Sequence, residues 1–274
     1  MKRRGFLFLA GAAIGLAGAG CTSTGAGTCG KTVSGKADVR ELIEVKTYVC
    51  SSVAKRDALI KVFDEALIPA LNRQGVRKVG VFWSNGEVND GNADYEKSVF
   101  VVIPRPDAAS VLDGDQRLLA DPEYVKAAAA LFSAPMAEPL YDSSSSTLLR
   151  GFATCPKVNK VTDSPDRVLQ LRTYNSYTTE RNLRKISMFE QGGEIGTFRA
   201  CGMEPVFFGQ ALAGDRLPNL TYLLGFADKA AKDAGWAKFR THPDWLKLKA
   251  DPQYKDTANK ITNIVLRPSK GSQL

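Results

Sequence analysis

The fold of this 274-residue chain is decided by Ile43-Glu44-Val45-Lys46-Thr47-Tyr48, which returns 126 residues later (43 to 169) as Leu169-Gln170-Leu171-Arg172-Thr173-Tyr174. A second block aligns at a shift of 121 residues (121 to 242), where Asp121-Pro122-Glu123-Tyr124 corresponds to His242-Pro243-Asp244-Trp245. One such match arises by chance, but matches that keep their order along the chain indicate a duplicated unit. The sequence therefore predicts two copies of one domain.

Each copy has the periodicities of a strand, a helix, two strands, a helix and a closing strand. In the first copy these are residues 42–49, 54–73, 79–83, 98–103, 118–131 and 147–152; in the second they are residues 168–174, 179–190, 206–209, 220–226, 230–240 and 261–266. The βαββαβ order is typical of a ferredoxin-like unit, an α+β fold with both helices on one face of a four-stranded antiparallel sheet. We predict domains at residues 41–155 and 167–268, joined by a polar linker at 156–166.

The first strand of each copy alternates between an apolar and a polar face. The polar face consists of Glu44, Lys46 and Tyr48 in the first copy and of Gln170, Arg172 and Tyr174 in the second. We expect the apolar faces to pack on the helices and the polar faces to meet between the two sheets. Such packing leaves a polar, aromatic-lined space inside the pair.

Four residues of these polar faces are candidate ligand-binding groups. Lys46 and Arg172 supply a cation for a carboxylate or phosphate, and Tyr48 and Tyr174 supply a phenol as hydrogen-bond donor. The alternative is internal use, with Lys46 paired to Glu44 or another acid and the tyrosines filling the interface, because a buried charge without a partner is costly.

Three motifs of the second copy occur together: the strand 169–174, the aromatic hairpin Pro205-Val206-Phe207-Phe208-Gly209, and the run Phe239-Arg240-Thr241-His242-Pro243-Asp244-Trp245. In this order they resemble the NIPSNAP family, and the resemblance covers residues 41–267. It implies a dimeric α/β-barrel fold whose ferredoxin-like units pair through their sheets, here as a pseudo-dimer within one chain or as a homodimer. The first copy departs from the family pattern at Lys46 and Asp121, which makes Arg172 and Tyr174 the better site.

The resemblance implies no catalytic residues, since the family has no well-established enzymatic activity and some members associate with membranes and protein partners. We therefore expect a non-catalytic protein that binds a small anionic or aromatic ligand, or another protein, through a cavity between the two sheets, without a cofactor. The alternative is a monooxygenase-like α/β-barrel enzyme acting on an aromatic or quinone-like substrate. Haem is disfavoured because an axial histidine belongs on a pocket-facing helix.

The single histidine, His242, excludes a histidine-rich metal centre, and no metal site is expected. His242 is a further candidate ligand-binding residue, although its place at the end of a predicted helix favours capping. The formal charge of +8 includes Lys2, Arg3 and Arg4 of the leader, and the remaining excess does not indicate nucleic-acid binding.

Residues 1–20 have the basic start and short apolar run of a bacterial signal peptide, and Arg3-Arg4 resembles a twin-arginine signal. Cleavage before Cys21 and lipidation of its thiol would anchor the protein in the cell envelope, with residues 21–40 as a flexible tether. The alternative is ordinary cleavage after Ala19, which gives a soluble periplasmic protein.

The remaining cysteines are Cys29, Cys50, Cys155 and Cys201. Four cysteines allow three pairings, and the sequence does not choose among them. A disulfide is possible because export places the chain in an oxidising compartment. The alternative is that these cysteines are buried free thiols.

Overall fold

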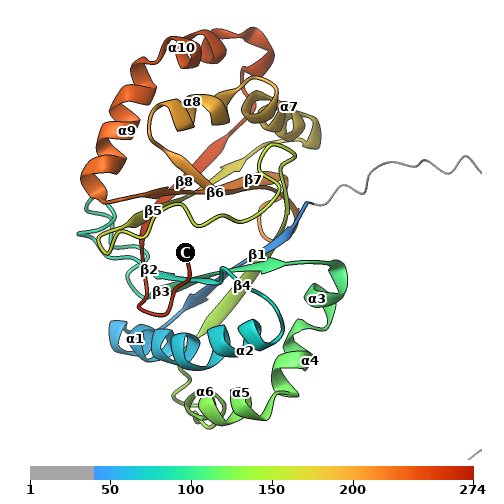
Figure 1. Cartoon of the computed structure of the whole chain (residues 1–274), viewed down its shortest axis with the longest axis vertical. Helices are drawn as coiled ribbons and strands as arrows, with labels where there is room; N and C mark the ends of the chain where they lie inside the picture. The colour runs from blue at the N-terminus through green and yellow to red at the C-terminus, as the bar shows by residue number, and fades with distance from the viewer. Residues whose placement is uncertain (1–39) are drawn as a thin grey trace, which may run out of the picture. The chain divides into compact units, whose positions relative to one another are not determined.

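Eight antiparallel strands close into a barrel within residues 40–274, the part of the chain that the computed structural model describes (Figure 1). The strands are β1 (Leu42–Val49), β2 (Gly80–Trp83), β3 (Ser98–Arg105), β4 (Ser143–Gly151), β5 (Val168–Asn175), β6 (Glu204–Ala213), β7 (Asn219–Phe226) and β8 (Lys260–Pro268). Their order around the barrel is β1-β3-β2-β8-β5-β7-β6-β4. The predicted signal peptide (1–20), Cys21, Cys29 and nearly all of the predicted tether (21–40) lie outside the described residues.

The helices cover the outside of the barrel in two groups, one on each side (Figure 1). The first group is α1 (Val53–Val62), the π-helical turn η1 (Phe63–Leu67), α2 (Ile68–Arg73), α3 (Ala108–Leu112), α4 (Gly114–Leu119), α5 (Pro122–Ala127) and α6 (Ala129–Phe132). The second is α7 (Thr179–Glu190), α8 (Glu194–Ala200), α9 (Lys229–Thr241), α10 (Pro243–Ala250) and the short 3₁₀ turn η2 (Pro252–Tyr254). No helix among residues 40–274 has the length and apolar composition needed to cross a membrane.

The mixed α/β class and the positions of the predicted strands agree with the structure, but several helices differ. The helix expected at 54–73 widens into η1 just before Pro69, whose ring has no N–H and crowds the preceding turn. The helix expected at 118–131 is broken where Asp121 caps the start of α5 through the backbone N–H groups of Glu123 and Tyr124. Three short helices, α3, α8 and α10, were not predicted.

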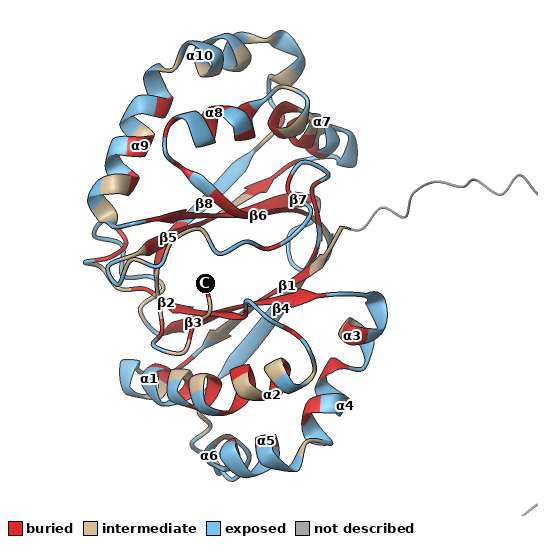
Figure 2. Ribbon diagram, viewed as in Figure 1, coloured by how far each residue is buried: buried red, intermediate tan, exposed pale blue. Residues whose placement is uncertain are grey.

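The orientation predicted for the strand faces is wrong. Ile43, Val45, Leu169 and Leu171 belong to the apolar cluster inside the barrel, whereas Tyr174 packs with the aromatic residues of the helix side. Figure 2 shows that buried residues concentrate on the strands, while the outer faces of the helices are exposed. The reason is closure: the inner faces of all eight strands converge in a space that excludes water, so the branched apolar side chains fill it.

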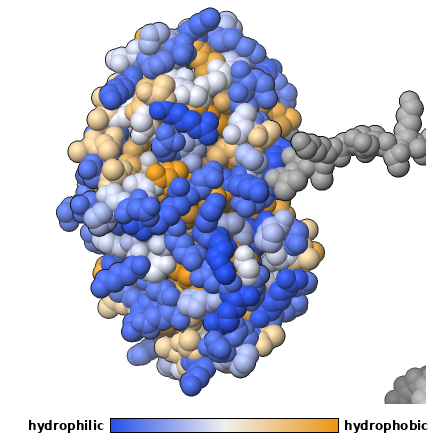
Figure 3. Space-filling model, in the orientation of Figure 1, coloured by the Kyte–Doolittle hydropathy of each residue, from blue (hydrophilic) through white to orange (hydrophobic). Residues whose placement is uncertain are grey.

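The two groups of four strands join at their edges. β4 pairs with β6, with Leu149 opposite Ala211, and β2 pairs with β8, with Phe82 opposite Pro268. One end of the interior is filled by Val158, from the helix- and strand-free segment 156–166, and by Leu274, which is 2% exposed. The face seen in Figure 3 is mostly hydrophilic, with only scattered apolar patches.

Leu223→Ala tests whether the aliphatic faces of the strands form the barrel interior, since Leu223 lies inside the barrel and is fully buried. We expect the free energy of unfolding to fall by about 2–5 kcal/mol because truncation leaves a cavity in a closed space. Leu212→Ala in β6, where the side chain is 49% exposed, is the matched control and should change it by about 0.5 kcal/mol or less. Urea unfolding measures both, and equal effects would contradict the proposed interior.

Candidate functional site

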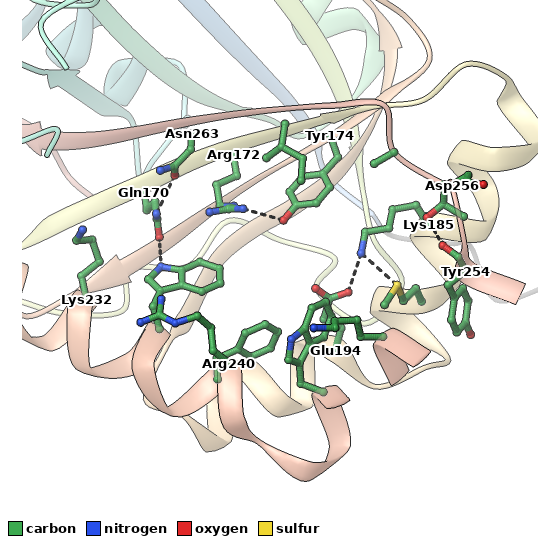
Figure 4. A pocket seen from close by; sticks show the side chains of 18 of the residues that line it. Gln170, Arg172, Tyr174, Lys185, Glu194, Lys232, Arg240, Tyr254, Asp256 and Asn263 are labelled. Carbon is green, nitrogen blue, oxygen red and sulfur yellow. Dashed lines mark hydrogen bonds and ion pairs between the residues drawn. The ribbon is translucent and has the colours of Figure 1, made fainter. Parts of the chain in front are cut away.

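A cavity of about 830 Å³ lies between the outer face of the second-half sheet and helices α7–α10 (Figure 4). Its wall on the sheet side is made by β5 and β8, and its opposite wall by the four helices. The side chains that define its chemistry are Gln170, Arg172 and Tyr174 from β5, Lys185 and Glu194 from α7 and α8, Trp236 and Phe239 from α9, Trp245 from α10 and Asn263 from β8. The cavity is therefore an aromatic chamber with cationic and amide groups on its walls.

Arg172 is the central cation of this chamber. Its Nη2 donates a hydrogen bond to the Tyr174 hydroxyl at 3.0 Å, and the guanidinium carbon lies 4.7 Å from the centre of the Trp236 ring. Its Nε is buried and has no hydrogen-bond partner, and no carboxylate of residues 40–274 lies within 4.0 Å of the guanidinium. The guanidinium thus has hydrogen-bonding capacity that the described protein does not use.

Tyr174 extends this contact to a second phenol. The hydroxyls of Tyr174 and Tyr222 are 3.3 Å apart, and their ring centres are 5.6 Å apart. Burial raises the pKa of Tyr222 well above its usual value, so this phenol is neutral and can donate a proton to a hydrogen bond at physiological pH. Arg172, Tyr174 and Tyr222 form one hydrogen-bonded row along β5 and β7.

Two hydrogen-bonded side-chain carboxamides, Gln170 and Asn263, hold the indole of Trp236 in place. Trp236 Nε1 donates to Gln170 Oε1, and Gln170 Nε2 donates to Asn263 Oδ1 at 2.8 Å. Gln170 is only 3% exposed, so these two bonds satisfy a carboxamide that would otherwise be buried without partners. The indole is therefore fixed as a flat wall against which Arg172 stacks.

A buried ion pair closes the far side of the cavity. Lys185 Nζ lies 3.0 Å from Glu194 Oε2, and both side chains are almost fully buried. Burial raises the pKa of Glu194, while Lys185 acts in the opposite direction. Lys185 Nζ also lies 4.4 Å from the centre of the Phe189 ring. Its charge is therefore already paired with Glu194, unlike that of Arg172.

The long turn between β2 and β3 reaches across from the first half to the edge of the cavity. Asp90 on this turn pairs with Lys232 at 2.8 Å and with Lys229 at 3.0 Å, both on α9. Burial acts to raise the pKa of Asp90, but the two lysines outweigh it and lower the pKa. The second-half site is thus completed by a segment of the first half.

The corresponding region of the first half is internally neutralised. Lys46 Nζ lies 3.2 Å from Glu44, and Glu44 also binds Arg105 at 2.7 Å and the Ser146 hydroxyl at 2.9 Å. Burial acts to raise the pKa of Glu44, but Lys46 and Arg105 hold it below its usual value. The cavity beside Lys46 and Tyr48 measures about 290 Å³.

The two halves carry different residues at the aligned positions that surround the strand cation. Glu44 corresponds to Gln170 in the repeat, and Arg105 corresponds to Phe226. The second half therefore has a carboxamide at the position where the first half has the carboxylate that neutralises its strand cation. Tyr48 differs as well: its ring packs against Phe63 and Tyr141, and burial raises its pKa above its usual value.

His242 lies outside both of these cavities. It ends α9 and begins α10, where its Nδ1 accepts a hydrogen bond from the backbone N–H of Asp244 at 3.3 Å. Cys50, Cys155 and Cys201 are buried free thiols, and burial raises the pKa of each. Within residues 40–274 no cluster of side chains has the composition of a metal site.

The structure brings Arg172 and Tyr174 together in one cavity and places Lys46 and Tyr48 in another. Sequence reasoning missed Lys185 and Glu194, which lie on helices that carry no recognisable motif. Trp236 was not among the candidate residues either, although this indole both packs against Phe198 and lines the cavity. The sequence signal that pointed to this site was the polar face of β5. It identifies Arg172 and Tyr174 but none of the helix residues.

A family model described as NIPSNAP matches residues 169–273. Among solved structures, a proposed monooxygenase from Lactobacillus acidophilus has a TM-score of 0.55 at 11% identity, over 84% of this chain and 94% of the other. A second one, from Fusobacterium nucleatum, has a TM-score of 0.55 at 9% identity, over 84% and 93%.

A NIPSNAP-like domain protein from Burkholderia xenovorans is 18% identical over 38% of this chain and 87% of its own, with a TM-score of 0.34. The comparison with curated proteins found no match. At 9–11% identity, the two structures with a TM-score of 0.55 show a shared fold and nothing more. The similarity to the NIPSNAP family thus lies in residues 169–273, which contain β5 to β8 and the cavity with Arg172.

Proposed function

We propose that this protein binds a small molecule with an aromatic body and an anionic oxygen in the second-half cavity. The observation that carries the proposal is Arg172, a largely buried guanidinium whose Nε has no hydrogen-bond partner and which has no carboxylate within 4.0 Å among the described residues, the buried Glu194 acting on it only from farther away. A cation removed from water is costly unless a partner compensates it. An anionic ligand in the cavity would be that partner.

The shape of the cavity supports an aromatic body for the ligand. Three aromatic side chains line it: Trp236 meets Phe239 edge to face with ring centres 5.5 Å apart, and the ring centres of Phe239 and Trp245 lie 4.6 Å apart. Flat rings of this kind bind flat apolar ligands, and a few polar groups then set the orientation. Arg172 and Tyr174 would hold the ligand oxygen beside these rings.

We interpret each half as a ferredoxin-like unit and the whole as a pseudo-dimer within one chain. The interpretation is supported by equal strand orders, β4-β1-β3-β2 in the first half and β8-β5-β7-β6 in the second. On this view one copy has kept an open ligand site, while the other has neutralised it with Glu44. The role is non-catalytic binding, in keeping with the family.

Arg172→Gln tests the proposed role directly, with 2-naphthoate as the anionic probe and 2-naphthamide as its neutral analogue. We expect calorimetry to show naphthoate affinity about 10–100-fold lower in the variant, because a hydrogen bond to a charged group contributes about 1.5–3 kcal/mol. Lys46→Gln in the neutralised first half is the control and should leave the affinity unchanged. Equal losses in both variants, or equal binding of the amide by the wild type, would reject the proposal.

Gln170→Glu is a sharper variant, because it restores the carboxylate that the first half has at Glu44. The new carboxylate can still accept the indole hydrogen bond of Trp236 while it neutralises Arg172, although it no longer donates to Asn263 Oδ1, whose side chain must turn to present its Nδ2 instead. We therefore expect a folded protein, shown by an unchanged circular dichroism spectrum, with about tenfold weaker naphthoate binding. Unchanged binding would mean that the charge of Arg172 does not recognise the anion.

The second candidate is a monooxygenase-like reaction on an aromatic or quinone-like substrate. It is favoured by the row of Arg172, Tyr174 and Tyr222, which would stabilise an enolate or phenolate oxygen, and by the shared fold with the two proposed monooxygenases. Anthrone is the test substrate: with one O₂ it gives anthraquinone and one water. Oxygen uptake that requires Arg172 would support the enzyme, whereas naphthoate binding without uptake would support the binding protein.

We further propose that the protein is exported and anchored in the cell envelope by a lipid on Cys21. The support is the sequence of residues 1–21 alone. Expressed in a bacterial host, the wild-type chain should fractionate with membranes and carry acyl groups on an N-terminal Cys21 by mass spectrometry. Cys21→Ser should move it to the soluble fraction. A mature chain that begins at Gly20 would instead indicate ordinary cleavage after Ala19.

A further inference from the structure

The lining of the barrel interior changes from aliphatic to hydroxyl-bearing at one end. On β5 the inward residues are Leu169 and Leu171, followed by Thr173 and Asn175. β8 shows the same change, from Leu266 and Ile264 to Thr262. Because inward positions alternate with outward ones, this change is a property of the inner surface alone.

The same change occurs on five strands at the same end. The residues involved are Thr47 on β1, Ser145 and Thr147 on β4, Thr173 on β5, Thr221 on β7 and Thr262 on β8. Their registers place them side by side: Thr173 is opposite both Thr221 and Thr262, and Thr47 is opposite Ser145. Together they form a band of hydroxyls, which we call the hydroxyl band.

The hydroxyl band lines a cavity of about 200 Å³ that is separate from the Arg172 site. Its apolar wall is formed by Val45, Phe100, Leu171 and Ile264, and the Tyr95 ring lies 6.0 Å from that of Phe100. The opposite end of the barrel is filled by Val158 and Leu274. This cavity is therefore a pocket rather than a channel.

Much of the polar capacity of this pocket is unused. Thr173 and Thr221 hydrogen-bond one another at 2.9 Å, but the hydroxyls of Thr47, Thr147 and Thr262 bond to no group of residues 40–274. Asn175 is 8% exposed and donates its Nδ2 to the Arg216 carbonyl at 2.7 Å, while its Oδ1 accepts no hydrogen bond from the described chain. A nearly buried carboxamide oxygen and three free hydroxyls thus surround one small space.

The chemistry of these groups defines the ligand. Hydroxyls both donate and accept, so they match the hydroxyls of a ligand better than a formal charge. The charged side chains of the lining, Asp215 and Arg216, are exposed and lie on the turn between β6 and β7. The Tyr95 and Phe100 rings offer a surface for C–H groups.

From these observations we infer that the mouth of the barrel binds a small neutral polyol, of the size of a single sugar ring. Thr47, Thr147, Thr262 and Asn175 hydrogen-bond its hydroxyls, and the aromatic and aliphatic wall contacts its carbon frame. The inference does not depend on the function proposed for the Arg172 cavity.

The test variant is Thr47→Val with Thr262→Val, because it removes two free hydroxyls at nearly constant shape and breaks no hydrogen bond within the described protein. The probes are glucose, myo-inositol and xylitol, followed by saturation-transfer NMR and titration. We expect at least one probe to bind the wild type and to bind the double variant about tenfold more weakly, since each hydrogen bond contributes about 0.5–1.5 kcal/mol. The midpoint of thermal unfolding should stay unchanged.

Arg172→Gln is the control and should leave polyol binding intact, which separates this pocket from the Arg172 cavity. Absence of saturation transfer from all three probes would overturn the inference, as would equal affinity in the double variant. Glucuronate tests the charge: tighter binding than glucose would identify an anion site and reject a neutral one.

Discussion

Closure of the eight-stranded barrel is the constraint on which the rest of this structure depends. Below the hydroxyl-lined mouth the interior excludes water, so the strands give their inner faces there to Ile43, Val45, Leu169, Leu171 and similar residues. The other face of each strand is left for the helices. Long polar side chains such as Arg172 are tolerated there, because the gap between a sheet and its helices can hold charged heads, aromatic walls and a cavity. The candidate site is therefore outside the barrel as a consequence of what fills the inside.

The two halves of the barrel treat the strand cation differently. Both halves place a cation and a tyrosine at aligned positions of β1 and β5, but in the first half Glu44 and Asp115 lie beside the cation, Lys46. In the second copy a carboxamide, Gln170, takes the place of the carboxylate and orients Trp236 instead. The exchange between the carboxylate of Glu44 and the carboxamide of Gln170 is thus one of the differences that leave Lys46 paired and Arg172 without a carboxylate within 4.0 Å among the described residues. The loop that carries Asp90 shows that the halves still cooperate.

Much of the fold could be predicted from the sequence. The strand pattern and the internal repeat placed Lys46, Tyr48, Arg172 and Tyr174 at equivalent positions, and the pairing of Lys46 with Glu44 was one of the two alternatives considered. Less of the site could be predicted, since Lys185 and Glu194 become neighbours only when α7 and α8 fold onto β5. The break at Asp121 and the π-helical turn before Pro69 were also missed, because both depend on local hydrogen bonds that periodicity does not report.

The sequence by itself determined that strands and helices alternate, that they do so twice, and which side chains share a face of each strand. Those properties follow from local periodicity, which each segment carries alone. Only the tertiary structure decided which face points inward, because that choice depends on whether two sheets stack as open layers or join at their edges. Edge pairing of β4 with β6 and of β2 with β8 made the aliphatic face the inner one. The position of Arg172 beside Trp236, and of the hydroxyl band at the barrel mouth, follows from that single choice.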